Sequence, residues 1–90
     1  MLARSVVKNG RVPKVEDYRI AAPFSLEGLV AAANSVLREH PDVLVGRRTV
    51  RYYIEEGLLL PPAGAPKYAR YHLEHLLRLL LVRLLLSNRL

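Results

Sequence analysis

The stretch from Pro61 to Pro66, which reads Pro-Pro-Ala-Gly-Ala-Pro, restricts the fold of this chain more than any other feature. Proline has no backbone N–H and fixes φ, so a helix cannot continue through this stretch. The apolar helical patterns on its two sides must therefore belong to separate helices. We interpret the segment between them as a rigid loop that serves as a short β-wing.

A first helix is predicted to begin at Phe24-Ser25 and to run to about Glu39. Ser25 is a good N-cap, and Phe24 and Leu29 occupy the two positions of a hydrophobic staple. Apolar residues recur there at helical spacing, namely Leu26, Leu29, Val30, Ala33 and Leu37. His40-Pro41-Asp42 then ends the helix, because the residue before a proline is pushed out of the α region.

A second helix is predicted from Arg47 to Glu56, with Gly46 as its cap and Gly57 as its end. Its apolar positions, which we expect to face inward, are Val50, Tyr53 and Ile54. The remaining surface carries Arg47, Arg48 and Arg51 near the helix N-terminus, so one face is cationic and solvated.

The last helix is predicted from about His72 to Asn88, and it carries leucines on two sides. One side contains Leu73, Leu77, Leu80, Leu81 and Leu84, and the other contains Leu76, Leu79, Val82 and Leu86. Two apolar faces require two partners. We expect one partner to be the domain's own core and the other to be a second copy of the chain, which predicts a homodimer.

The length of 90 residues fits one hydrophobic core, and the 51% hydrophobic content is that of a globular protein. The predicted class is mostly α. We divide the chain into a basic N-terminal arm at residues 1–23 and a folded domain at residues 24–90. In the arm, the apolar pairs around Asn9-Gly10 suit a hairpin or an extended segment. The arm then enters a minor groove, pairs with the wing as an extra strand, or stays disordered.

The net charge of +6 is the bias expected of a protein that binds a polyanion. The arm and the segment from Arg47 to Tyr71 each hold five basic and two acidic residues. An Arg-rich helix N-terminus suits the phosphates and base edges of the DNA major groove, and Lys67 and Arg70 of the wing can reach flanking backbone. The alternative without a binding function is that these arginines form weak surface ion pairs with Glu55 and Glu56.

Several function classes are not expected. There is no cysteine, hence no disulfide or thiolate metal site. No apolar run is long enough for a signal peptide or a membrane span, so a cytoplasmic location is the default. His72 and His75 have the spacing of two metal ligands on a helix, but no third ligand is apparent. No catalytic motif is present, and we expect neither an enzyme, nor a cofactor, nor a membrane-surface role for the Leu-rich helix with its Arg78, Arg83 and Arg89.

The order of three motifs resembles the DNA-binding domain of the MerR (mercury-resistance regulator) family. They are Thr49-Val-Arg-Tyr-Tyr53, Gly57-Leu-Leu followed by prolines, and Ala69-Arg-Tyr71 followed by a long helix. The resemblance covers roughly residues 24–90 and implies a winged helix-turn-helix whose second helix enters the major groove. It further implies that Arg48 and Thr49 lie at base or backbone contacts and that Arg51 and Tyr52 meet phosphate. Arg70 and Tyr71 match its wing residues, and Tyr53 supports the core.

The predicted function is therefore that of a sequence-specific regulator that binds double-stranded DNA. The predicted DNA-binding residues are Arg47, Arg48, Thr49, Arg51, Tyr52, Lys67, Arg70 and Tyr71. The chain departs from the family in three ways: Gly46 replaces a Ser or Thr cap, roughly residues 34–44 are extra before the second helix, and the 90 residues leave no room for the family's effector region after the wing and one helix. We expect that the chain dimerises through the Leu-rich helix, is a piece of a larger regulator, or acts with another protein. The extra residues either lengthen the first helix or form a loop. The third departure motivates the alternative function, a winged-helix module that binds another regulator or a polymerase subunit.

Overall fold

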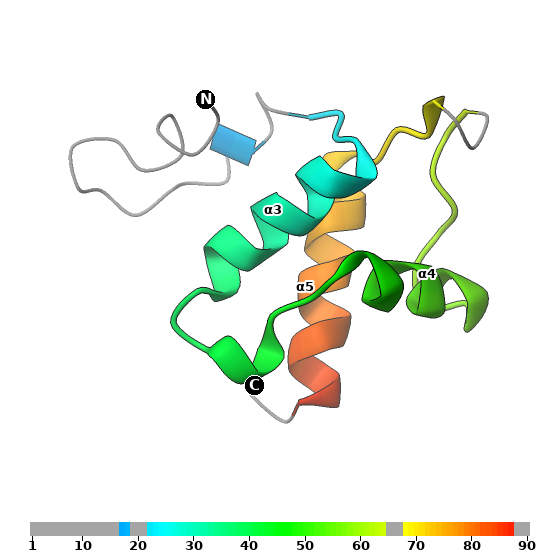
Figure 1. Ribbon diagram of the computed structural model, residues 1–90. Helices are drawn as coiled ribbons and strands as arrows, with labels where there is room; N and C mark the ends of the chain where they lie inside the picture. Colours follow the sequence, from blue (N-terminus) through cyan, green and yellow to red (C-terminus); the bar gives the residue numbers. More distant parts are fainter. Residues whose placement is uncertain (1–16, 19–21, 65–67, 88–90) are drawn as a thin grey trace.

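The computed structural model describes residues 17–18, 22–64 and 68–87. In these ranges the elements are α3 (Leu26–Leu37), the 3-10 turn η1 (Pro41–Val43), α4 (Arg47–Glu55) and α5 (Leu73–Leu86). Helix α3 packs against both α4 and α5, and α5 runs between the other two when viewed as in Figure 1. The described part of the chain is therefore mostly α, as predicted.

Helix α3 begins where its cap residues predict. Ser25 is the N-cap, and its hydroxyl oxygen accepts a hydrogen bond from the Gly28 backbone N–H at 3.0 Å. Phe24 and Leu29, the two staple positions, are both buried. The helix ends at Leu37, two residues before the predicted end.

The connection from α3 to α4 is a loop that contains η1. Of the two predicted possibilities for the extra residues, a longer helix or a loop, the structure has the loop. Pro41 is the first residue of η1. A backbone N–H at the first helical position has no acceptor within the helix, so the N–H that proline lacks costs no hydrogen bond. Leu44 to Gly46 then lead into α4 without regular structure.

Helix α4 ends in a Schellman motif. Gly57 has φ +78°, a left-handed conformation that glycine adopts without steric cost. Its N–H donates to the Ile54 carbonyl at 3.1 Å, and the Leu58 N–H donates to the Tyr53 carbonyl at 2.8 Å. The predicted end of the helix at Gly57 is thus confirmed to within one residue, and the chain turns sharply toward the proline-rich loop.

The predicted β-wing is not confirmed as a pair of strands. In the described ranges, the segment between α4 and α5 has a single antiparallel bridge, in which Ala63 and Arg70 exchange backbone hydrogen bonds of 3.0 and 2.9 Å. A second bridge joins Phe24 to Tyr71. Prolines 61 and 62 have no N–H to donate to a ladder, which explains why pairing does not extend beyond Ala63.

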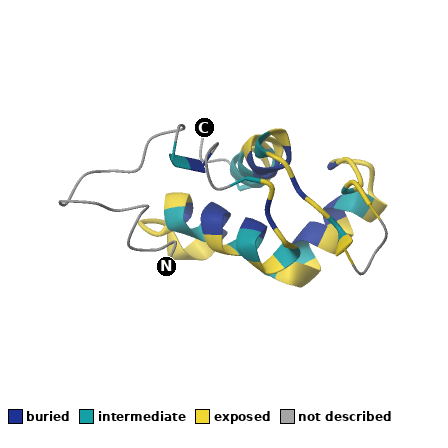
Figure 2. Ribbon diagram, turned by 90° about the horizontal axis from the view of Figure 1, so that it is seen from above, coloured by how far each residue is buried: buried dark blue, intermediate teal, exposed yellow. Residues whose placement is uncertain are grey.

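The core lies where the three helices meet. Figure 2 shows buried and exposed residues alternating around each helix, as amphipathic helices require. The buried side chains include the predicted Val50 and Tyr53 of α4, while Ile54 is half-buried. The largest fully buried side chains are Leu29, Leu59, Leu76, Leu79, Val43 and Val50.

One face of α5 belongs to this core and another faces solvent. Leu76 and Leu79 are buried, whereas Leu77 and Leu81 are 48% and 51% exposed. The predicted division of α5 into two apolar faces is therefore seen in the burial pattern, and the exposed face has no partner in the described part of the chain.

Most of the arm at residues 1–23, including the predicted hairpin, lies outside the described residues. Tyr18 is described, and its ring is buried in the core. Its hydroxyl is 3.2 Å from the Ser35 hydroxyl of α3. The Tyr18 side chain therefore packs against the folded domain.

Candidate nucleic-acid interface

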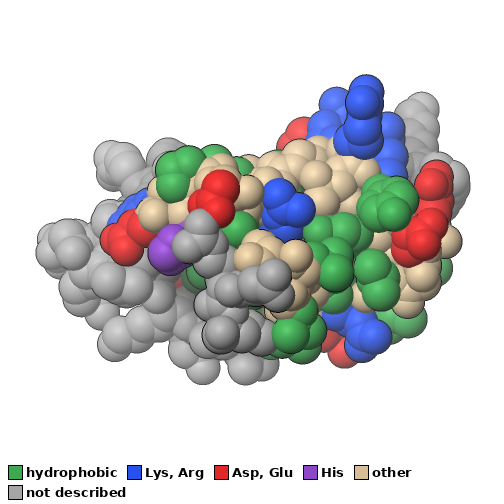
Figure 3. Space-filling model, turned by 90° about the horizontal axis from the view of Figure 1, so that it is seen from below, with side chains coloured by type: hydrophobic (Ala, Val, Ile, Leu, Met, Phe, Trp, Pro, Cys, Tyr) green, Lys and Arg blue, Asp and Glu red, His purple; other side chains and the backbone are tan. Residues whose placement is uncertain are grey.

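Helix α4 presents a cationic surface made of Arg47, Arg48 and Arg51. All three side chains are exposed, while Val50 and Tyr53 on the opposite side are buried. Helical geometry forces this separation, because Val50 and Tyr53 are three residues apart and share the core face. Figure 3 shows basic side chains gathered at the end of the molecule where α4 lies in Figure 1. The structure thus brings the three predicted arginines together on one solvent-exposed surface.

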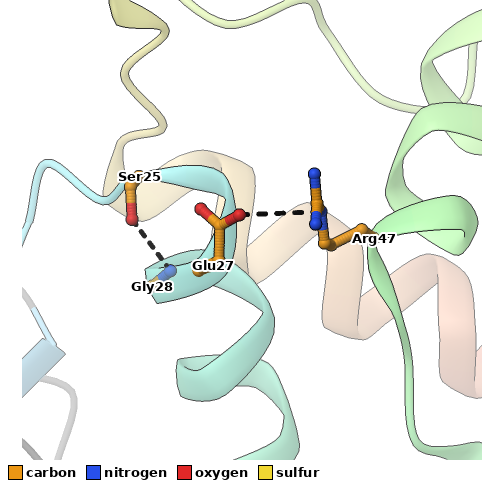
Figure 4. A network of polar contacts seen from close by, with 4 residues as sticks. All are labelled: Ser25, Glu27, Gly28 and Arg47. Carbon is orange, nitrogen blue, oxygen red and sulfur yellow. Dashed lines mark hydrogen bonds and ion pairs between the residues drawn. The ribbon is translucent and has the colours of Figure 1, made fainter.

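Glu27 of α3 contacts this cationic surface. Its carboxylate Oε2 lies 3.6 Å from the Arg47 Nε, and Figure 4 shows the two side chains reaching toward each other from α3 and α4. Both are well exposed, at 68% and 57%, so the ion pair is worth little and a phosphate can replace it. Sequence reasoning missed Glu27, which is 20 residues from Arg47 and shares no motif with it.

Thr49 has a structural role at the start of α4. Its hydroxyl oxygen accepts a hydrogen bond from the Gly46 N–H at 3.1 Å. A capping box has two side-chain hydrogen bonds, one from the N-cap residue and one from the residue three positions later. Gly46, the N-cap, has no side chain, so only the second bond, made by Thr49, is present here. Tyr52, in contrast, is 54% exposed and projects its ring into solvent.

The predicted wing residues have different environments. Arg70 is exposed, and its Nη1 donates to the Tyr68 carbonyl at 3.2 Å. Lys67 lies outside the described residues. Tyr71 is buried at 5% exposure, and burial raises the pKa of its hydroxyl, while the charge of Arg51 lowers it and that of Glu27 raises it. Tyr71 therefore supports the surface from within, and its neighbours Arg51 and Glu27 are close enough to act on it electrostatically.

Two arginines of α5 point back into the domain. Arg78 Nε donates to the Leu58 carbonyl at 3.0 Å, just beyond the end of α4. Arg83 donates to two carbonyls of the connection that precedes α4, those of Val43 and Leu44. A basic residue inside a leucine-rich run is the signal that could have identified them as internal donors.

Within the described ranges, no helix is long and apolar enough to cross a membrane.

His72 and His75 take part in the start of α5. The His72 N–H donates to Nδ1 of His75 at 3.0 Å, and Nε2 of His75 lies 3.2 Å from the Pro61 carbonyl. These partners place the proton of a neutral His75 on Nε2. No group of three or more potential metal ligands occurs in the ranges that the structure describes. The pair therefore caps the helix and anchors the proline-rich loop.

A family model described as the MerR HTH family regulatory protein matches residues 43–90, more than half of the chain. The match includes α4, the proline-rich loop and α5. No curated protein and no solved structure matches. The chain belongs to the MerR family of helix-turn-helix regulatory proteins.

Proposed function

We propose that this chain binds double-stranded DNA in a sequence-specific manner and regulates transcription, with α4 in the major groove. The proposal is carried by the exposed row of Arg47, Arg48 and Arg51 on a helix of a MerR-family domain. Guanidinium groups bond guanine bidentately and also bind phosphates. The N-terminus of α4 adds backbone N–H groups and the positive end of the helix dipole.

The predicted residues other than Tyr71 divide by the part of DNA they would reach. In this proposal Arg48 and Thr49 face base edges, Arg51 and Tyr52 face phosphates, and Arg47 joins them once Glu27 is displaced. Lys67 and Arg70 would meet the backbone beyond the groove. Tyr71 is not a contact in this proposal, because its side chain is buried. A DNA-binding role agrees with the cytoplasmic location expected from the sequence.

We further propose that two copies of the chain pair through α5. Leu77 and Leu81 line a groove of about 270 Å³ together with Leu60, with Glu74 and Arg78 at its rim. An α5 helix from a second copy, running antiparallel, would cover the leucines. It would also set Leu77 of each copy against Leu81 of the other, since in a two-fold interface residue i contacts residue j and j contacts i. A dimer would place two α4 helices on two half-sites.

The DNA proposal is tested by replacing Arg51 with glutamine. A duplex is first selected from a random-sequence library with the wild-type chain, and binding is then measured by fluorescence anisotropy. Arg51→Gln should weaken binding to the selected duplex by about 1 to 3 kcal/mol, which is about five- to 150-fold. If Arg51 contacts a phosphate, random-sequence duplex should lose affinity to a similar degree and the salt slope should fall by about 1.

Arg38→Gln is the matched control, because it removes the same charge from an exposed site at the end of α3 remote from Glu27. It should leave binding nearly unchanged. If the two substitutions weakened DNA binding equally, the effect of Arg51→Gln would come from the loss of net charge and not from a contact made by α4. Absence of any effect of Arg51→Gln contradicts the proposed interface, and a partner protein that stays bound after nuclease treatment would then favour the interaction-module alternative.

A further inference from the structure

The three residues Val43, Leu44 and Val45 run from the last residue of η1 to the residue before Gly46, the cap of α4. The side chains of Val43 and Val45 are buried, at 0% and 6% exposure. Buried backbone groups require hydrogen-bond partners, and this segment has no strand or helix to supply them for its carbonyls. Side chains from two other helices supply them instead.

Asn34 of α3 holds the end of the segment. Its Oδ1 accepts from the Val45 N–H at 2.8 Å, and its Nδ2 donates to the Val45 carbonyl at 2.8 Å. The amide thus pairs with both backbone groups of one residue, as a neighbouring strand would. This two-point contact fixes the position and the rotation of Val45, and α4 begins two residues later.

Arg83 of α5 holds the start of the segment. Its Nε donates to the Val43 carbonyl at 2.8 Å, and its Nη2 donates to the Leu44 carbonyl at 3.3 Å. The remaining Nη1 lies 3.4 Å from the hydroxyl of Tyr53 on the buried face of α4. One planar guanidinium therefore joins α5, the connection and α4, which a lysine with its single charged nitrogen cannot do.

We propose that Asn34 and Arg83 are positioning residues that fix α4 relative to α3 and α5 and thereby set the sequence specificity of DNA binding without touching DNA. This inference rests on the proposed function. The connection between α3 and α4 spans residues 38–46 and its one regular element is η1, so no tight turn determines where α4 starts. The clamp on residues 43–45, made by Asn34 and Arg83, takes over that task.

The mechanism concerns geometry instead of charge. Bidentate contacts to bases require the arginines of α4 at defined positions in the groove, whereas nonspecific attraction to phosphates tolerates a displaced helix. Loss of the clamp should therefore reduce affinity for a preferred site far more than affinity for random-sequence duplex. A merely stabilising role would change the melting temperature and leave the binding of the folded protein unaltered.

The experiment uses the full chain, a duplex selected by the wild type, and random-sequence duplex, well below each variant's melting temperature. Asn34→Ala changes no charge. It should lower the affinity for the selected duplex by about five- to a hundredfold, while affinity for random duplex stays within about twofold. Arg83→Lys should behave in the same way, because it keeps the charge but not the three-point contact.

Two results would overturn the proposal. One is wild-type specificity in folded Asn34→Ala, and the other is full specificity in Arg83→Lys, which would show that the charge alone suffices. Asn34→Asp covers the case in which Asn34→Ala does not fold, since it keeps the acceptor for the Val45 N–H and loses the donor; it should also lose specificity, and retained specificity overturns the clamp.

A failure of the proposed function can be told apart from a failure of the clamp. If the wild type prefers no duplex, the proposed function fails. The clamp is then judged by residual dipolar couplings of the backbone in the wild type and in folded Asn34→Ala or Asn34→Asp. The couplings of α4 should no longer fit the wild-type orientation relative to α3 and α5. An unchanged orientation of α4 overturns the clamp whatever the chain binds.

Discussion

Glu27 lies in the first turn of α3, and its carboxylate is 3.6 Å from the guanidinium nitrogen of Arg47. At the scale of single residues, this carboxylate competes with DNA phosphate for Arg47. It also favours the N-terminus of its own helix, where an acidic side chain is stabilised by the dipole. The residue therefore adds slightly to stability and subtracts from the positive surface of α4.

Replacing Glu27 with glutamine should strengthen DNA binding. An exposed pair is worth about 0.2 to 1 kcal/mol, so the expected gain in affinity is about 1.5- to fivefold at about 50 mM salt. The gain should shrink at about 200 mM salt, because exposed charges are screened. Anisotropy titration at both salt concentrations measures it.

The matched control is Glu39→Gln, another exposed carboxylate, which follows the opposite end of α3. It should change affinity less than Glu27→Gln does. An equal gain in both variants would mean that only net charge changed, and a loss of affinity in Glu27→Gln would contradict the competition between Glu27 and phosphate.

At the scale of elements, the limits of α3 and α4 could be predicted because their signals are local. Ser25 caps α3 through Gly28, three residues away, and Gly57 ends α4 by donating to the Ile54 carbonyl, three residues before it. The contacts that hold the connection between the helices could not be predicted. Asn34 and Arg83 reach it from 11 and about 40 residues away, so no local pattern reveals the contact.

In the wing and the candidate site, too, features with a local signal could be predicted and features that depend on long-range contacts could not. The exposure of Arg47, Arg48 and Arg51 follows from helical spacing and was predicted correctly. The burial of Tyr71 was not, because it depends on the backbone bridge between Tyr71 and Phe24 and on the packing of α5. A pairing partner 47 residues away in the sequence leaves no periodic signal.

Gly57→Ala should destabilise the domain, since alanine pays a conformational cost in the left-handed region. No atom outside the neighbouring residues lies within 4 Å of the position of an added Cβ. The change in stability should therefore reflect the backbone conformation alone, without a steric clash. We expect a loss of about 1 to 2 kcal/mol in the free energy of unfolding, measured by urea denaturation.

Gly57→Asn is the paired variant, because asparagine tolerates this conformation better than alanine does. Its loss should be smaller. An alanine variant as stable as the wild type, or an asparagine variant that loses more, would contradict the role assigned to the left-handed turn at Gly57.

At the scale of the whole molecule, the proposed dimer would make the exposed leucines of α5 and the cationic face of α4 act together. The core uses one side of α5, and the other side, with Leu77 and Leu81, remains exposed beside Leu60. In the proposed dimer this second face joins two copies. Two α4 helices held at a fixed distance then select DNA by the spacing of half-sites.

Leu81→Lys should convert the proposed dimer to a monomer at micromolar concentrations, because a lysine in the pair interface introduces two unpaired charges related by symmetry. Size-exclusion chromatography with light scattering reports the mass. Val36→Lys is the matched control, since Val36 of α3 is 46% exposed and lies on another helix. It should stay dimeric, and a wild type that is monomeric throughout contradicts pairing through α5.

The salt dependence of DNA binding tests the central claim most directly. Purified wild-type chain is titrated into labelled random-sequence duplex by fluorescence anisotropy at about 50 and 200 mM salt. If α4 lies against phosphates, affinity should fall steeply, with a log–log slope of about −0.9 for each phosphate neutralised. Absence of binding at the lower salt concentration would contradict the account.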